Sequence, residues 1–227
     1  RKLKFVVANL LFTVAASHAQ EVTFTGTADK KYDGNEIVLY WTDGKDTAVV
    51  QDGKFEFKLP FKDPTRYMFM SRLDARKDGK YAPFGILVAK SGTIRIEGNI
   101  EEFSASKVKG AKDDELYNSF NAISSKAKRK IQDDLVQKYG AALVKNKKPD
   151  TSDSRYKQMM QEYQQMSEAN EKLEVDRLRK FIKENRGSFA VVCLLDSRAR
   201  NLELAEVEAL YKLLAPTYKE SRNGQSI

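Results

Sequence analysis

The pair Asp52-Gly53 constrains the fold more than any other short segment, because it separates two runs of alternating polar and apolar residues. Asp-Gly favours a two-residue type I′ turn, in which both central residues need a positive φ that Gly adopts freely and Asp tolerates. After the turn, Phe55, Phe57 and Leu59 recur at every second position, with Lys and Glu between them. We therefore expect a β-hairpin over residues 47–59 whose second strand is half buried.

Further segments on both sides have strand character and are separated by turn residues rather than by helices. They are residues 21–28, 37–41, 66–72, 82–89, 93–98 and, as a short strand, 105–108. Seven or eight short strands at this spacing predict an antiparallel β-sandwich or barrel-like sheet, which we place in residues 20–110.

The hydrophobic period changes from two to about 3.6 near Asp113, which indicates helices. The first predicted helix runs from Asp113 towards Tyr139, and a polar connection over residues 145–153 leads to the second. The apolar stripe of the first helix contains Leu116, Phe120, Ile123, Ala127, Ile131 and Leu135. That of the second contains Tyr156, Met159, Tyr163, Met166 and Leu173, with Asn170 at the remaining seam position.

Two helices of about 30 residues each predict an antiparallel helical hairpin packed along one seam. The Tyr and Met side chains of the second stripe have two interpretations. Ordinary helix–helix core is favoured, because Met and Tyr fill such seams routinely, and a groove that binds a partner is the alternative.

Two shorter helices complete the helical region, residues 111–217. Gly187 is expected just after the end of the second long helix and Ser188 at the N-cap of the third. The third helix would bury Phe189, Val192, Cys193 and either Leu194 or Leu195, and the fourth would bury Leu204, Val207, Leu210, Tyr211 and Leu214, with Pro216 helping to end it. The polar residues 218–227 are expected to be a linker towards a C-terminal domain. The predicted fold class is therefore α+β.

Residues 1–19 have the three parts of a secretory signal peptide. A basic start with Arg1, Lys2 and Lys4 precedes an apolar run over residues 5–16, and Ser17-His18-Ala19 is a small-x-small cleavage site. The apolar run is too short for a membrane-spanning helix. We therefore expect an exported protein, periplasmic or in the cell envelope, with no membrane span after cleavage.

Cleavage after Ala19 would remove the only histidine, His18, and leave Cys193 as the only thiol. Catalysis by Ser-His-Asp or Cys-His groups, zinc sites built on His or paired Cys, and an internal disulfide are then excluded. Cys193 lies among apolar residues, so a buried, inert thiol is favoured over a reactive one. We expect no catalytic residue, no cofactor and no metal.

Other candidate sites have ordinary structural explanations. Asp113-Asp114-Glu115 suits the start of a helix better than a calcium site, because it lacks the loop spacing that calcium needs. Glu101-Glu102 and Asp133-Asp134 give no cue for the shifted pKa values of a glycosidase. Tyr40 and Trp41 point to opposite sides of a strand, so one of them is expected in the core, although the sheet near Trp41 is kept as a glycan- or peptide-binding alternative.

The net charge of +8 falls by three, to +5, when Arg1, Lys2 and Lys4 are removed with the signal. The remaining cations are interleaved with acids, and the two basic runs, residues 126–130 and 145–148, are expected on a solvated helix face and in a loop. No nucleic-acid partner is expected, because its binding needs a concentrated basic face.

Several short motifs occur in the order found in a known family. They are Thr23-Phe24-Thr25-Gly26, Ile37-Val38-Leu39, residues 50–57 (VQDGKFEF), residues 91–98 (SGTIRIEG), Val108-Lys109-Gly110 and residues 181–189 (FIKENRGSF). In this order the chain resembles the N-terminal part of Bacteroidetes-type TlpA-like thiol-disulfide oxidoreductases, in which a signal peptide, a β-rich domain of unknown function and a helical segment precede a thioredoxin-like domain.

The resemblance implies a function for a longer parent protein rather than for these residues. The Cys-x-x-Cys motif of the family matches no position here, so the chain is expected to be a non-catalytic accessory module. Its implied partners are a thioredoxin-like domain in the same polypeptide, client proteins and a membrane reductant, and a second copy of the chain is kept open as a further partner.

Overall fold

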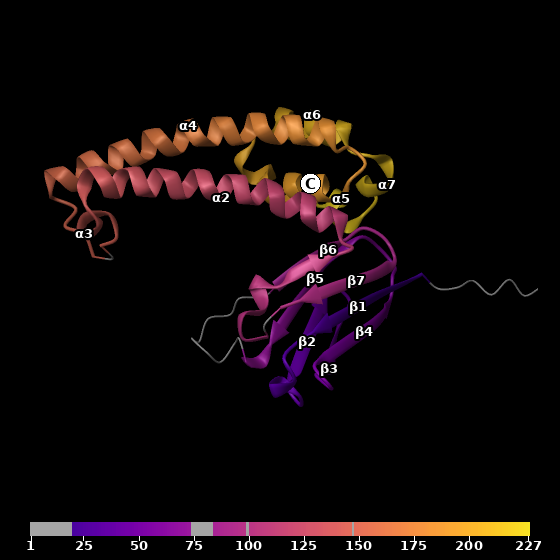
Figure 1. Ribbon diagram of the computed structural model, residues 1–227. Helices are drawn as coiled ribbons and strands as arrows, with labels where there is room; N and C mark the ends of the chain where they lie inside the picture. Colours follow the sequence, from indigo (N-terminus) through magenta and orange to yellow (C-terminus); the bar gives the residue numbers. More distant parts are fainter. Residues whose placement is uncertain (1–19, 74–83, 99, 147) are drawn as a thin grey trace, which may run out of the picture.

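The computed structural model describes residues 20–73, 84–98, 100–146 and 148–227 (Figure 1). The predicted signal peptide and residues 82–83 of a predicted strand lie outside the described residues. Within them the α+β class is confirmed: eight strands form two sheets that do not close into a barrel, and helices follow. In Figure 1 the helices form a layer on one side of the two sheets.

Each sheet has four strands. The first has the order β4 (Lys54–Pro60), β1 (Glu21–Thr27), β7 (Gly92–Glu97), β8 (Lys107–Lys109), and the second has the order β3 (Gly44–Val49), β2 (Glu36–Trp41), β5 (Thr65–Ser71), β6 (Phe84–Val88). The strand pairs are antiparallel except for β1 and β7, which are parallel with Phe24 opposite Ile94. Alternation shows which face of a strand is buried but not which distant strand pairs with it.

The turn at Asp52-Gly53 is confirmed, since φ is 50° at Asp52 and 68° at Gly53. The predicted hairpin is wrong, because β3 and β4 enter different sheets and only Gln51 and Lys54 pair across the turn. The carboxylate of Asp33 accepts hydrogen bonds from the backbone N–H of Asp52 at 3.0 Å and of Gly53 at 2.8 Å. The turn is therefore a corner between the two sheets.

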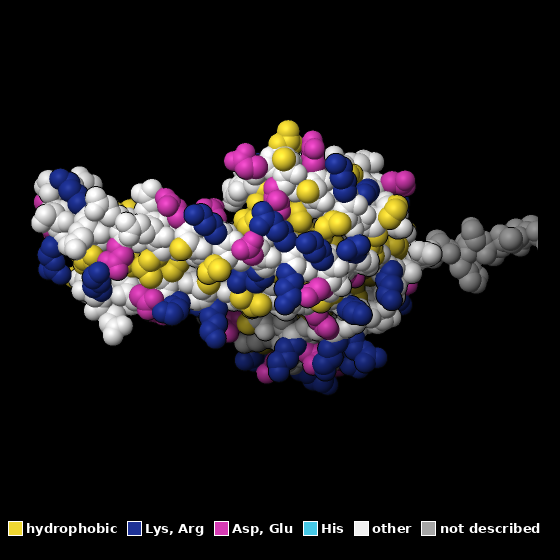
Figure 2. Space-filling view, turned by 90° about the horizontal axis from the view of Figure 1, so that it is seen from above, with side chains coloured by type: hydrophobic (Ala, Val, Ile, Leu, Met, Phe, Trp, Pro, Cys, Tyr) yellow, Lys and Arg dark blue, Asp and Glu magenta, His cyan; other side chains and the backbone are white. Residues whose placement is uncertain are grey.

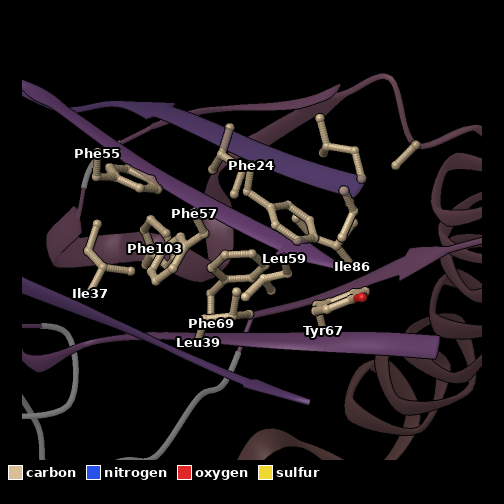
Figure 3. Close-up of a cluster of buried hydrophobic side chains, with 14 of the residues drawn as sticks. Phe24, Ile37, Leu39, Phe55, Phe57, Leu59, Tyr67, Phe69, Ile86 and Phe103 are labelled. Carbon is tan, nitrogen blue, oxygen red and sulfur yellow. The ribbon is translucent and has the colours of Figure 1, made fainter. Parts of the chain in front are cut away.

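The core between the sheets combines aliphatic side chains with a connected set of aromatic rings (Figure 3). Phe24 contacts both Tyr67 and Phe69 with ring centroids 5.0 Å apart. As predicted, β4 buries Phe55, Phe57 and Leu59 and exposes the residues between them. Two short 3-10 helices, η1 (Lys30–Tyr32) and η2 (Ile100–Ala105), were not predicted, and η2 contributes Phe103 to this core.

The long helices form the predicted antiparallel hairpin. In chain order the helical elements are α2 (Lys112–Tyr139), α3 (Ala141–Val144), α4 (Ser154–Glu184), α5 (Phe189–Arg198), η3 (Ala199–Asn201), α6 (Leu204–Leu213), α7 (Pro216–Lys219) and α8 (Arg222–Gln225). The distal halves of α2 and α4, with α3 at their tip, extend past the sheets as an arm (Figure 1). Among the described residues, no helix is long and apolar enough to cross a membrane.

The predicted stripes are only partly buried. On α2, Ile123 is 52% exposed and its neighbour Ser124 is buried instead. On α4, Met159 is buried, but Tyr163 is 47% and Leu173 is 65% exposed. The interpretation of this stripe as ordinary core is therefore wrong for its two exposed members, because α2 alone is too narrow to cover so wide an apolar face of α4.

Helix α4 ends one residue earlier than predicted, because a C′ residue at Gly187 would put the C-cap at residue 186. The C-cap is Asn185, whose side chain donates to the Phe181 carbonyl at 2.9 Å. Ser188 is the N-cap of α5, as expected, and accepts from the Ala190 N–H at 3.1 Å. All seven residues from Phe189 to Leu195 are buried, whereas Leu204 on α6 is 73% exposed.

Residues 218–227, expected to be a linker, are folded against α5. Ser221 and Gly224 are buried, and Asn223 and Ser226 both donate to the carboxylate of Asp196. The polar side chains that suggested a linker make these contacts, so the segment packs rather than extends.

Two neighbouring carboxylates in the first turn of α2 connect the sheets to the helices. Asp113 Oδ1 accepts from the Ser188 hydroxyl and the Phe189 N–H, both at 2.6 Å, at the start of α5. Asp114 Oδ1 accepts from the Leu87 N–H of edge strand β6 at 2.9 Å, and its other oxygen accepts from Asn118 at 2.8 Å. We call Asp113 and Asp114 the joint.

Strand β6 contributes to both cores. Ile86 and Val88 lie in the core between the sheets, whereas Leu87 lies with Phe120, Leu178 and residues of α5 in the helical core. The joint and Leu87 thus bond the edge of one sheet to the helices, which also protects that edge from pairing with another chain.

Replacement of Gly26 tests the packing of the sheet core. A Cβ at Gly26 would lie 1.8 Å from the Phe55 ring, which covers this glycine across the β1–β4 pair. We expect Gly26→Ala to lower the free energy of unfolding in urea by about 1–3 kcal/mol, because the ring must leave its place. Gly187→Ala is the matched control. No neighbouring atom lies within 4 Å of a Cβ at Gly187, so no change of that size is expected. Equal effects would contradict the packing described.

The pH dependence of Asp114 tests the joint. Burial raises the pKa of the Asp114 carboxyl above its ordinary value, although the Leu87 N–H, the charge of Arg66 and the Asn118 amide oppose the shift. The folded state therefore binds the proton more tightly than the unfolded state, whose Asp pKa is about 3.9. The stability that this proton contributes is present below that pH and is lost as the pH rises through the folded-state value.

The variant Asp114→Asn does not titrate at this position and isolates the effect. We expect the free energy of unfolding of the wild type, minus that of Asp114→Asn, to fall as the pH rises from about 4. Urea unfolding at a series of pH values measures it. A difference that rises with pH over this range would show that Asp114 is a carboxylate stabilised by folding.

Candidate functional site: a groove on the helical arm

A groove of about 780 Å³ opens where the covering helices end. Helix α5 and η3 pack on one face of the hairpin near the sheets, and Leu202 closes the inner end of the groove. Four buried apolar residues form its floor, namely Ile131, Leu135, Met159 and Leu178. Met160, 40% exposed, and Tyr163 line its α4 side. Figure 2 shows hydrophobic side chains in a row along the arm, with charged side chains beside them.

The two walls of the groove carry opposite charges. Lys128 is the one cation of residues 126–130 that lines the groove, on its α2 wall. Glu171 and Glu174 line the α4 wall, and Glu174 is paired with Arg198. The apolar floor therefore has a cation on one side and carboxylates on the other.

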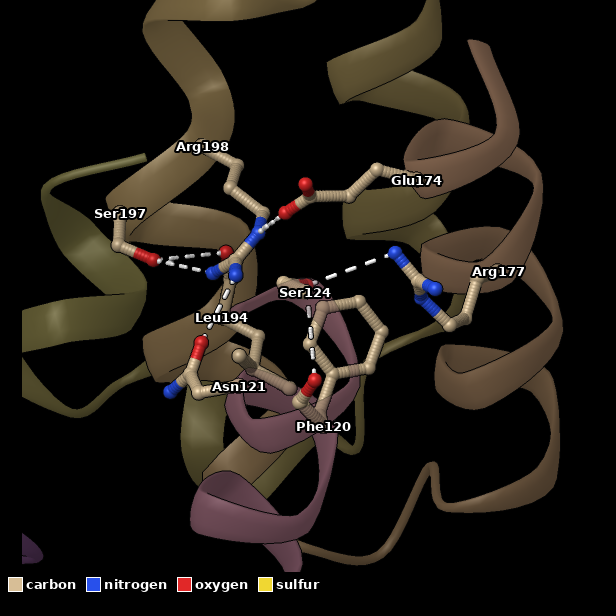
Figure 4. Close-up of polar contacts among 8 residues, drawn as sticks. All are labelled: Phe120, Asn121, Ser124, Glu174, Arg177, Leu194, Ser197 and Arg198. Carbon is tan, nitrogen blue, oxygen red and sulfur yellow. Dashed lines mark hydrogen bonds and ion pairs between the residues drawn. The ribbon is translucent and has the colours of Figure 1, made fainter. Parts of the chain in front are cut away.

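A polar cluster lies at the inner end of the groove (Figure 4). Arg198 pairs with Glu174 at 2.9 Å, and both side chains are only 17% exposed. The same guanidinium donates to the Asn121 side chain at 2.8 Å, and its carbon lies 4.9 Å from the centroid of the Phe120 ring. Arg177 lies 5.4 Å from that centroid. The pair fixes α4 and α2 to the end of α5, so this cluster positions the groove.

No acid–base pair or metal site is found near the groove in the described part of the chain. Arg198 and Glu174 satisfy each other, and no group of three or more His, Cys, Asp or Glu residues among the described ones is arranged to hold a metal ion. What the groove can do chemically is bind an apolar surface whose edges carry charge.

Cys193 is buried in α5, as expected, and is 9% exposed. Burial raises the pKa of its thiol to about 12, and the nearby carboxylate of Asp196 adds to the effect. The thiolate that reacts with disulfides is therefore almost absent at neutral pH.

The acidic residues weighed as calcium or glycosidase sites make contacts that stabilise the fold. Asp113 caps α5 and Asp114 binds β6, which accounts for both without calcium. Asp134 pairs with Lys130 one turn away at 2.6 Å. On β2, in the same sheet as β6, Trp41 is half-buried, packs against Gly44 and has its ring 6.4 Å from that of Tyr67. The Trp41 side chain therefore packs against the core between the sheets, and Tyr40 is half-buried as well.

Sequence reasoning kept a groove along the Tyr and Met stripe as the alternative to core and named Tyr163 and Met159, but it did not identify the other residues that complete the groove. Met160, Glu171 and Arg198 follow no separate motif, and their meeting depends on where α5 ends. One feature of the sequence did point to the groove. The apolar face of α4 is wider than α2 alone can cover in a simple hairpin.

Comparison with known families gives one match. Residues 22–117 match the family described as a domain of unknown function (DUF4369). The matched segment covers the eight described strands except for Glu21, the first residue of β1, and ends in the second turn of α2, so it includes the joint but not the groove. No curated protein and no solved structure matches the chain.

Replacement of Glu174 tests the polar cluster. Glu174→Ala leaves the mostly buried Arg198 without its carboxylate, and we expect a loss of about 2 kcal/mol in the free energy of unfolding. Glu168→Ala, one and a half turns away on the exposed side of α4, is the control and is expected to cost less than about 0.5 kcal/mol. Similar losses for both variants would show that the ion pair does not hold the helices together.

Proposed function

We propose that this chain is the non-catalytic N-terminal accessory module of an exported, periplasmic thiol-disulfide oxidoreductase of the TlpA-like type. The redox domain would follow residue 227 in the same polypeptide. The order of the sequence motifs supports the family, and the match of residues 22–117 to a domain of unknown function is compatible with it.

The proposal that this chain is non-catalytic is supported by the burial and the raised pKa of the Cys193 thiol. Its thiol is buried, its pKa is raised to about 12, and it is the only thiol in the chain. Reduction of a disulfide by a dithiol needs two. One thiolate attacks and displaces a substrate thiolate, and a second thiol then displaces the other substrate sulfur and leaves the enzyme as the disulfide. Both sulfurs would come from the thioredoxin-like domain.

The proposed role of the present residues is to support that domain. Residues 218–227 are packed on α5, so a domain that follows them would start from a fixed point at the base of the arm. The fixed base would hold the redox domain near the helical layer, and the arm would reach beyond the sheets (Figure 1).

The reactivity of Cys193 tests the proposal on the protein. We expect iodoacetamide to alkylate the native thiol at least about a hundredfold more slowly than the thiol in urea, because modification requires the helical core to open. We also expect the chain alone to show no catalytic turnover of a disulfide substrate such as insulin. Turnover by the chain alone would overturn the proposal.

The gene sequence tests the second part of the proposal, that a redox domain follows this chain. The reading frame after the codon for Ile227 is expected to encode a thioredoxin-like sequence with Cys-x-x-Cys. A stop codon or an unrelated domain there would overturn the proposed parent protein. The finding that the Cys193 thiol is buried would remain.

A further inference from the structure

The apolar surface along α2 and α4 is covered near the sheets and open on the arm. Helix α5 packs on both long helices there and shares the helical core with Leu178. Leu178 also lines the groove, so the floor of the groove continues the surface on which α5 lies. Among the described residues, no element extends this cover over Met160 and Tyr163, which are 40% and 47% exposed. The groove is therefore the uncovered continuation of a surface that already binds a helix.

The end of α5 shows how an ion pair holds a helix on this surface. Arg198, the last residue of α5, pairs with Glu174 of α4 at 2.9 Å (Figure 4). Glu171 lies about one turn further out on the same wall of α4, because residues three apart share a helix face. Among the described residues, no cation pairs with Glu171. A helix that lies in the groove can therefore pair a Lys or Arg with Glu171, as α5 pairs Arg198 with Glu174.

The α2 wall carries the opposite charge at about the same level of the arm. Lys138 of α2 pairs with Glu162 of α4 at 2.6 Å, which sets the antiparallel register of the two helices. In this register Lys128 of the α2 wall lies about level with Glu171 of the α4 wall. In the part of the chain that the structure describes, Lys128 has no carboxylate partner. The charges of the groove are therefore complemented by a carboxylate towards α2 and a cation towards α4.

The groove has the length and the lining of a site for a short helix. Met160 and Glu171 are eleven residues apart on α4, about 17 Å along its axis, which matches a helix of three turns. The floor between them contains Ile131, Leu135 and Met159, which can receive apolar side chains spaced at i, i+3 and i+7. The flexible Met side chains adapt to the shape of such a stripe.

We propose that the groove on the arm binds an amphipathic α-helix of a partner protein. The apolar stripe of that helix lies on the floor and against Tyr163. A Lys or Arg on one edge of the helix pairs with Glu171, and an Asp or Glu on the other edge pairs with Lys128. The bound helix continues the layer that α5 begins. This inference does not depend on the proposed redox parent.

The first test measures binding of a designed helix to the intact chain. The probe is a fluorescein-labelled peptide of three heptads with Leu at the a and d positions, Glu along one edge and Lys along the other. We expect fluorescence anisotropy to show binding at micromolar concentrations. Tyr163→Lys is expected to weaken it at least about tenfold, because it places a charge against the apolar stripe.

Leu173→Lys is the matched control for Tyr163→Lys. Leu173 lies on the same helix, is 65% exposed and does not line the groove, so we expect binding to change less than about twofold. Circular dichroism checks that both variants remain folded.

The second test exchanges charges between the walls and the peptide. Turning a helix end for end exchanges its edges, so the mixed peptide can always bring Lys to Glu171 and Glu to Lys128. We expect the wild type to bind it about fivefold more tightly than a peptide with Lys on both edges or one with Glu on both edges. Lys128→Glu is expected to prefer the peptide with two Lys edges, and Glu171→Lys the peptide with two Glu edges.

Four results would overturn the proposal. They are a wild type that binds none of the three peptides, equal weakening by Tyr163→Lys and Leu173→Lys, peptide preferences that charge reversal on the walls does not change, and self-association of the chain that Tyr163→Lys abolishes. The last result would assign the groove to a second copy of the chain.

Discussion

The joint formed by Asp113 and Asp114 is the interaction on which the rest of the structure depends. Two adjacent carboxylates at the start of α2 bond in different directions, one to the first N–H groups of α5 and the other to the backbone of β6. Asp113 supplies the negative charge that the N-terminus of α5 favours, and Asp114 satisfies an edge N–H that would otherwise be buried without a partner. The joint thus fixes the direction of α2, and with it the position of the arm.

The part of the hairpin near the sheets is covered by other helices, whereas the arm is not. Near the sheets the hairpin is covered by α5, η3 and α6 and held by the Arg198–Glu174 pair. Beyond them the apolar face of α4 is not covered, and the groove results. The thiol of Cys193 is part of the core of the region near the sheets.

Local patterns in the sequence predicted local structure well. Alternation located β4, the change of period located α2 and α4, and Asp-Gly located a turn with positive φ at both residues. Pairing across long distances was not predictable from these patterns. The turn at Asp52 joins two sheets rather than two paired strands because the carboxylate of Asp33, about twenty residues away, binds it.

The same limit applied to the candidate site. Asp113 and Asp114 were correctly assigned to a helix start, but their partners Ser188 and Leu87 lie 75 and 27 residues away. Tyr163 was placed on an apolar stripe, and only the position at which α5 ends decides that it is exposed. Burial in this molecule depends on which element covers which face, and no periodicity contains that information.

The most direct test of the joint is whether the sheets and helices unfold together. Trp41, the only tryptophan, reports on the sheets by fluorescence, and circular dichroism reports mainly on the helices. We expect the two urea transitions of the wild type to coincide and those of the double variant Asp113→Ala, Asp114→Ala to separate. Separate transitions in the wild type, or coincident transitions in the double variant, would contradict the central role of the joint.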